Sequence, residues 1–158
     1  MRFHLIDRIL EVEPGKSLKA FKLLTTGEEY LADHFPTFPV MPGVMMLQAL
    51  VEASAWLLRL SSDYKHSVIV MREARNVKYG SFMEPGKRMD ISVEMVDNDG
   101  RLATFKGKGE AEGTTTVSAR LVVAHYNLQD NDPSWKDVDE RMVQYYRDLS
   151  RLLVAPKA

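Results

Sequence analysis

The residues of this chain that are best suited to chemistry begin with His34, which lies in a loop stiffened by three prolines. Pro36, Pro39 and Pro42 fix φ and lack a backbone N–H, so the segment stays extended and joins a sheet poorly. An almost wholly apolar helix is expected to begin at Pro42, because the missing N–H costs nothing in a first helical turn. The sequence therefore sets an imidazole beside a helix N-terminus. In that arrangement a general base and an oxyanion-binding site can face one substrate.

The first residues of the helix are the second group of chemical interest. Gly43 and Val44 carry backbone N–H groups that, with the helix dipole, suit a developing oxyanion. Gly43 also lacks a Cβ, which lets a ligand approach the backbone closely. A lone loop histidine is more often a plain polar surface residue. The prolines and the helix start are what favour the functional interpretation of His34.

Two polar side chains interrupt the apolar helix. Gln48 and Glu52 are four residues apart, so they share one face of it. A helix that is apolar on nearly all sides is expected to be buried on nearly all sides, and a buried carboxylate is costly unless it is paired or protonated. Glu52 is therefore expected to have a partner or to line a wet cavity. The alternative is that both side chains lie at a subunit interface or rim, satisfied by backbone groups.

Hydrophobic periodicity predicts the elements that must position these groups. The expected order is a β-hairpin, one long apolar helix, four mostly antiparallel strands and an amphipathic tail helix. The expected ranges are 9–13 and 18–24 for the hairpin, 42–60 for the long helix, 68–79, 89–96, 102–112 and 115–126 for the strands, and 138–154 for the tail helix. One apolar helix needs a sheet to wrap it, so the fold class is α+β. We expect one domain over residues 1–127 and a C-terminal helical extension over 128–158.

Composition excludes several classes of function. The 158 residues suit one domain with a substantial core, and the net charge of −1 comes without a basic run, so no nucleic-acid surface is expected. Cysteine is absent and the four histidines lack metal-ligand spacing, so neither thiolate chemistry nor a metal site is expected. The N-terminus meets charge too early for a signal peptide, and the apolar stretch 44–58 is too short for a membrane span. The expected location is the cytoplasm.

The proline loop and the start of the helix resemble a known family. His34-Phe35-Pro36 and Pro39-Val40-Met41-Pro42-Gly43-Val44, followed by Leu47-Gln48-Ala49-Leu50, closely resemble the (3R)-hydroxyacyl-acyl-carrier-protein dehydratases of the FabZ type. The related FabA-type enzymes share the Pro-Val-Met-Pro-Gly run. The flanking stretches that also resemble the family are 5–16, 76–79 and Pro85-Gly86. The resemblance covers about residues 5 to 125, so the tail from Gln129 lies outside it.

The resemblance implies a fold and an activity. Its fold is the hotdog, a long central helix wrapped by an antiparallel sheet, here with an additional C-terminal helix. Family members form homodimers whose sheets join edge to edge, some of them trimers of dimers, with active sites at the dimer interface at the end of an acyl tunnel. The implied enzyme is a hydro-lyase that converts a 3-hydroxyacyl thioester into a trans-2-enoyl thioester in fatty-acid or related acyl-chain biosynthesis. It needs no cofactor, because phosphopantetheine of an acyl carrier protein or of CoA carries the substrate.

The resemblance also implies residue roles. His34 corresponds to the base that removes the C2 proton, and the N–H of Gly43 corresponds to the oxyanion contact. Val44, Phe35 and Pro42 flank these groups and are expected to help bind the substrate.

The catalytic acid departs from the family pattern. The family has Glu or Asp, contributed by the partner subunit, where this chain has Gln48, and an amide cannot deliver a proton. One turn further on, about 5 Å along the axis, Glu52 stands where FabZ-type sequences usually have Gln. Three interpretations follow: Glu52 is the acid with Gln48 positioning substrate, or His34 makes both proton transfers, or dehydration is lost. In the last case the protein is a hotdog acyl thioesterase or a non-catalytic acyl-carrier or acyl-chain binding subunit.

Overall fold

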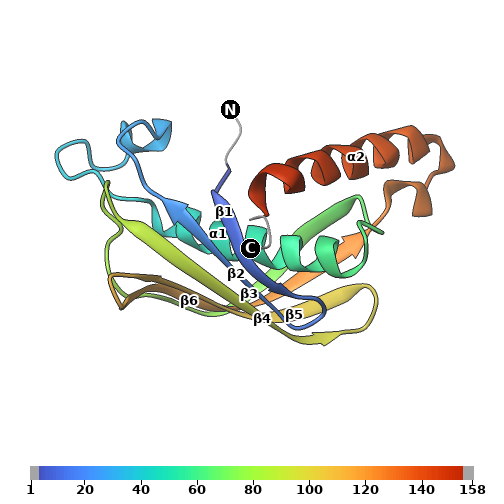
Figure 1. Cartoon of the computed structure of the whole chain (residues 1–158), viewed down its shortest axis with the longest axis horizontal. Coiled ribbons are helices and arrows are strands. Elements are labelled where there is room, and N and C mark those ends of the chain that lie inside the picture. The colour runs from blue at the N-terminus through green and yellow to red at the C-terminus, as the bar shows by residue number, and fades with distance from the viewer. Residues whose placement is uncertain (1–3, 155–158) are drawn as a thin grey trace.

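The structure, a computed structural model, describes residues 4–154 and consists of one long helix against a six-stranded antiparallel sheet, with a second helix beside the first (Figure 1). The strands are β1 (Arg8–Glu13), β2 (Ser17–Leu23), β3 (Val68–Tyr79), β4 (Arg88–Asn98), β5 (Leu102–Ala111) and β6 (Thr114–Tyr126), the helices are α1 (Gly43–Ser61) and α2 (Lys136–Leu153), and short 3₁₀ turns cover Glu29–Leu31, Leu128–Asp130 and Pro133–Trp135. The order across the sheet is β1-β2-β4-β5-β6-β3. The predicted α+β fold, with a central helix, an antiparallel sheet and a C-terminal helix, is confirmed.

Helix α1 forms the centre of the hydrophobic core. Leu50, Trp56 and Leu57 are almost completely buried in it. A Cβ on Gly107 of β5 would lie 3.1 Å from Leu50 Cδ1, so this glycine lets the helix lie close to the sheet. By length and composition α1 could cross a membrane, but 61% of its apolar window is buried inside the molecule, as in the core helix of a globular protein.

The start of α1 differs by one residue from the sequence expectation. Pro42 lies outside the helix, at the N-cap, because its ψ of 137° is extended rather than helical. Its carbonyl accepts hydrogen bonds from the N–H groups of Met45 and Met46, at 2.9 and 3.2 Å. The proline therefore contributes its carbonyl to the first turn, and Gly43 is the first helical residue.

Helix α2 is fastened to the body of the protein by one buried carboxylate. Asp139 is 2% exposed and accepts hydrogen bonds from the Ser67 hydroxyl and from the backbone N–H groups of Leu128 and Gln129. Burial raises the pKa of Asp139, but these hydrogen bonds outweigh it and hold the pKa below its usual value. The helix lies beside the C-terminal half of α1 (Figure 1), where Trp56 and Tyr146 meet edge to face with centroids 5.8 Å apart.

We expect Asp139→Ala to lower the free energy of unfolding by about 3 kcal/mol, because it leaves buried donors without an acceptor. Urea unfolding measures this difference. The matched control is Asp137→Ala on the exposed side of the same helix, which should cost no more than about 0.5 kcal/mol through the helix dipole. Equal small effects of the two substitutions would show that Asp139 does not anchor α2.

Candidate active site

The loop before α1 holds His34 in a defined orientation. Its Nδ1 lies 2.9 Å from the carbonyl oxygen of Val40. A carbonyl only accepts, so Nδ1 carries the hydrogen and the neutral ring keeps its lone pair on Nε2. The adjacent Phe35 has φ of +53°, a left-handed conformation that is strained for a residue with a side chain. The loop thus fixes both the tautomer and the direction of an imidazole that can act as a base at Nε2.

The N-terminus of α1 is bordered by an aromatic ring from the sheet edge. A Cβ added to Gly43 would lie 3.0 Å from Cε1 of Tyr79, tighter than ordinary van der Waals contact, so the glycine lets this ring lie close to the helix. Gly43 and Val44 hold the first two amides of the helix, which have no carbonyl within the helix to bind. Tyr79 is half exposed and closes one side of this group of donors.

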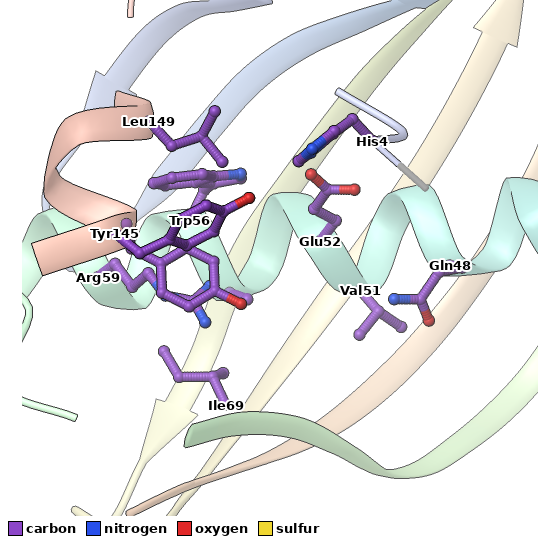
Figure 2. Close-up of a pocket in the computed structure, with 11 residues that line it drawn as sticks. His4, Gln48, Val51, Glu52, Trp56, Arg59, Ile69, Tyr145 and Leu149 are labelled. Atoms are coloured by element: carbon purple, nitrogen blue, oxygen red, sulfur yellow. The ribbon is translucent and has the colours of Figure 1, made fainter. Parts of the chain in front are cut away.

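A cavity of about 500 Å³ runs along one face of α1, and we call it the α1 pocket. Helix α1 lines it with Gln48, Val51, Glu52, Ala55, Trp56 and Arg59. On the other side α2 contributes Tyr145, Tyr146 and Leu149, with His4 and Ile69 completing the wall (Figure 2). The spacing of the α1 residues is that of one helical face, so the pocket follows the helix axis for about three turns.

Glu52 is the acidic group of this pocket. Its Oε2 accepts a hydrogen bond of 2.9 Å from the backbone N–H of Leu5, and Figure 2 shows the carboxyl directed toward His4. Burial raises the pKa of Glu52 above its usual value, and the Leu5 amide, His4, Trp56 and Arg59 offset only part of this effect. The sequence-based expectation of a partner or a cavity is met by both. A backbone partner such as the Leu5 amide is also expected if Glu52 lies at a subunit interface or rim and has no catalytic role.

The structure brings together some of the predicted site residues and separates others. Gln48 and Glu52 line the α1 pocket of the described chain, whereas His34 does not line it. Residues 4–154 contain no group of three or more His, Cys, Asp or Glu side chains that could hold a metal ion.

Sequence analysis missed Arg59, although it lies seven residues after Glu52 and continues the polar face of α1. It also missed the tyrosines of α2, because no local pattern links that helix to this pocket.

The edge of the sheet next to the loop is exposed and apolar. Strand β3 pairs only with β6, so within residues 4–154 its other edge has no strand beside it. Nearby, five large apolar side chains are between 46% and 68% exposed, and we call them the loop-edge patch: Phe35, Phe38, Val44, Tyr79 and Phe82. An unpaired strand edge beside such a patch is the surface on which a second chain can add.

Comparison with known sequences gives one consistent family. The FabA-like domain family matches residues 1–120 of this chain. The chain is 33% identical over 133 residues to the 3-hydroxyacyl-[acyl-carrier-protein] dehydratase FabZ of Janthinobacterium sp. (strain Marseille), covering 82% of this chain and 85% of that protein. It is 31% identical over 122 residues to the FabZ dehydratase of Bacillus subtilis (strain 168), covering 77% of this chain and 86% of that protein.

Comparison with solved structures gives the same fold at lower identity. The dehydratase heterocomplex ApeI:P from Xenorhabdus doucetiae superposes with a TM-score of 0.68 at 16% identity, covering 84% of this chain and 90% of that chain. The protein smu.793 from Streptococcus mutans UA159, bound to acetyl CoA, has a TM-score of 0.59 at 12% identity, covering 79% of this chain and 92% of that chain. Both chains share the hotdog arrangement of helix and sheet described above.

Proposed function

This chain belongs to the FabA-like family as a 3-hydroxyacyl-[acyl-carrier-protein] dehydratase of the FabZ type, a hydro-lyase, and from that premise we propose the roles of its residues. His34 is the general base, Glu52 of a partner subunit is the general acid, and the N–H of Gly43 binds the thioester oxygen. Gln48 positions the hydroxyl that leaves. The observation that supports this assignment of the acid is that Gln48 and Glu52 share the α1 pocket and that burial raises the pKa of Glu52.

The chemistry needs one proton removed and one delivered. His34 takes the C2 proton of the 3-hydroxyacyl thioester on Nε2, and the electron pair moves toward the thioester carbonyl, where the N–H of Gly43 stabilises the developing negative charge. The C3–O bond then breaks, and the hydroxyl leaves as water with the proton of Glu52. The C2–C3 double bond of the trans-2-enoyl thioester remains. A raised pKa suits Glu52 to this task, because more of it stays protonated near neutral pH.

The site needs two copies of the chain. His34 lies outside the α1 pocket of its own subunit, and the loop-edge patch and the free edge of β3 offer a surface for a second subunit. A homodimer joined at β3 buries these apolar side chains and brings the loop of one subunit toward α1 of the other. Trimers of dimers are compatible with the same pairing.

The partners and conditions follow from the reaction. We propose that the substrate arrives on the phosphopantetheine arm of an acyl carrier protein and that CoA thioesters can replace it. Base, acid and oxyanion donor all come from the chain, so the reaction requires neither a cofactor nor a metal. The cytoplasm is the proposed location, since acyl carrier proteins deliver their substrates there.

The glycine at the helix start provides a first mutational test. Gly43→Ala places a methyl group 3.0 Å from the half-exposed Tyr79 ring, so the ring or the first turn of the helix must shift. We expect kcat to fall at least about tenfold through weaker oxyanion binding, with a loss of stability of about 1 kcal/mol. Steady-state kinetics and thermal unfolding measure the two effects. The control, Gly27→Ala, meets only Thr25 Oγ1 at 3.6 Å and should change neither quantity.

The direct test of the function uses purified protein and a (3R)-3-hydroxyacyl pantetheine thioester. Enoyl thioester absorbance should grow in, and free thiol should not appear. Release of thiol without enoyl product would indicate a thioesterase. Absence of both signals, with tight binding of acylated carrier protein, would indicate a non-catalytic binding subunit.

A further inference from the structure

A guanidinium with one unsatisfied N–H is buried at the far end of the α1 pocket. Arg59 is 5% exposed, and its guanidinium carbon lies 3.6 Å from the centroid of the Tyr146 ring and 5.6 Å from that of Trp56. Its Nε is buried without a hydrogen-bond partner, and none of the ion pairs among the described residues includes it. Burying a guanidinium with an unsatisfied N–H is costly, and Glu52 on the same helix offsets only part of that cost, so the arrangement calls for an acceptor that enters the pocket.

Arg59 lies at the end of the α1 pocket opposite to the proposed catalytic residues. Gln48 and Glu52 lie at one end of the pocket, and Arg59 follows Glu52 by seven residues, about 10 Å along the helix axis. An acyl chain held by its thioester near Glu52 and laid along α1 brings its far end to the guanidinium. Tyr145 and Tyr146, which close this end, lie beyond residues 1–120 that match the FabA-like family, so the closure belongs to the C-terminal extension.

The chemistry at the closed end disfavours an ordinary fatty acyl chain. A terminal methyl group would desolvate the guanidinium of Arg59 further and would offer its N–H groups no hydrogen-bond acceptor. A terminal carboxylate would accept charge-assisted hydrogen bonds from the guanidinium, and its own charge would be neutralised. The carboxyl of Glu52 lies two helical turns away and repels such a group weakly, since burial raises its pKa.

We propose that the α1 pocket selects acyl thioesters whose far end carries a carboxylate, held by Arg59 between Trp56 and Tyr146. This inference rests on the proposed function, which sets the direction in which the acyl chain of the substrate enters the α1 pocket. It adds a substrate class, the ω-carboxyl acyl chains, to the reaction. Arg59 is then a specificity-determining residue that contacts the substrate away from the reacting atoms.

Binding tests the pocket without catalysis. Isothermal titration calorimetry compares the monomethyl ester of a medium-chain dicarboxylic acid, called the diacid below, with the methyl ester of the monocarboxylic acid of the same length, called the monoacid, so that only the diacid carries a free carboxylate. We expect wild-type protein to bind the diacid about tenfold more tightly. Arg59→Met should remove this preference, Arg59→Lys should reduce it, and Arg151→Met, at an exposed arginine of α2, should leave it unchanged. Equal or tighter binding of the monoacid by wild-type protein would overturn the proposal, even if Arg59→Met did not fold.

Kinetics separate this inference from the proposed function. Two 3-hydroxyacyl pantetheine thioesters of equal length, one ending in methyl and one in carboxylate, should give a kcat/KM ratio of about ten in favour of the carboxylate. The ratio does not depend on the fraction of active protein, and it should fall to one or below in Arg59→Met. Dehydration of both substrates with equal kcat/KM would contradict the carboxylate preference alone. Dehydration of neither would contradict the proposed residue roles, while the binding comparison would still decide the preference.

Discussion

Replacing His34 with alanine is expected to lower kcat about 10³-fold, because the reaction loses the base that removes the C2 proton. The imidazole is fixed by one hydrogen bond to Val40, and its loss removes little buried surface, so the folded state should persist. Stopped-flow or steady-state absorbance of the enoyl product measures the rate, and thermal unfolding measures the stability.

The matched control is Asp33→Asn, which changes the exposed neighbour of His34 in the same loop. Its kcat should stay within about threefold of the wild type, since surface substitutions of this kind have small effects. If His34→Ala kept the wild-type rate, the base would be another group and the assignment of the loop would fail.

Glu52→Gln is expected to lower kcat about 10²- to 10³-fold, because an amide cannot deliver the proton that leaves with water. The substitution keeps the shape of the side chain, and its amide oxygen can still accept from the Leu5 N–H. A small change in the melting temperature with a large change in kcat therefore identifies an acid. A large fall in the melting temperature with kcat retained in the folded fraction would show that Glu52 serves only to clamp the N-terminal segment.

The pH profile gives the same prediction an independent readout. A general acid must be protonated, so kcat/KM of the wild type should fall as pH rises through the pKa of Glu52. Since burial raises that pKa, the fall should come at higher pH than for an exposed glutamate. In Glu52→Gln this limb of the profile should disappear from the residual activity.

The double substitution Gln48→Glu with Glu52→Gln tests at which of the two positions on α1 a carboxyl can deliver the proton. It restores the order of side chains usual in FabZ-type sequences. We expect it to remain nearly inactive, because the carboxyl then lies one helical turn, about 5 Å, from the position at which this chain delivers the proton. Full recovery of kcat would mean that the substrate sits as in the family and that Gln48 impairs the natural site.

Much of the fold could be predicted from the sequence, for reasons visible in particular elements. Strands β4 to β6 alternate apolar and polar residues and are joined by turns at Gly100 and Gly113, both with positive φ, so their pairing follows from local pattern. The apolar composition of α1 predicted its burial. The boundary at Pro42 was wrong by one residue, because a proline can serve as N-cap or as first helical residue and the sequence pattern does not distinguish the two.

The site could be predicted only in part. The spacing of Gln48 and Glu52 predicted their shared face, which is a property of one helix. The partner of Glu52 is Leu5, near the N-terminus, and the ring over which Arg59 lies is Tyr146 of α2, so these contacts depend on how distant segments pack on α1. The roles that we propose for His34 and Glu52 require a second subunit, which no pattern within one chain describes.

Mixing two inactive variants tests the shared site most directly. His34→Ala and Glu52→Gln dimers are unfolded together, refolded and assayed for dehydration. If each site takes His34 from one subunit and Glu52 from the other, the mixed dimer holds one intact site. Random pairing should then restore about a quarter of the wild-type activity. If the mixture stays as inactive as its components although mixed dimers have formed, both residues must act within one subunit or Glu52 is not the acid, and the account is contradicted.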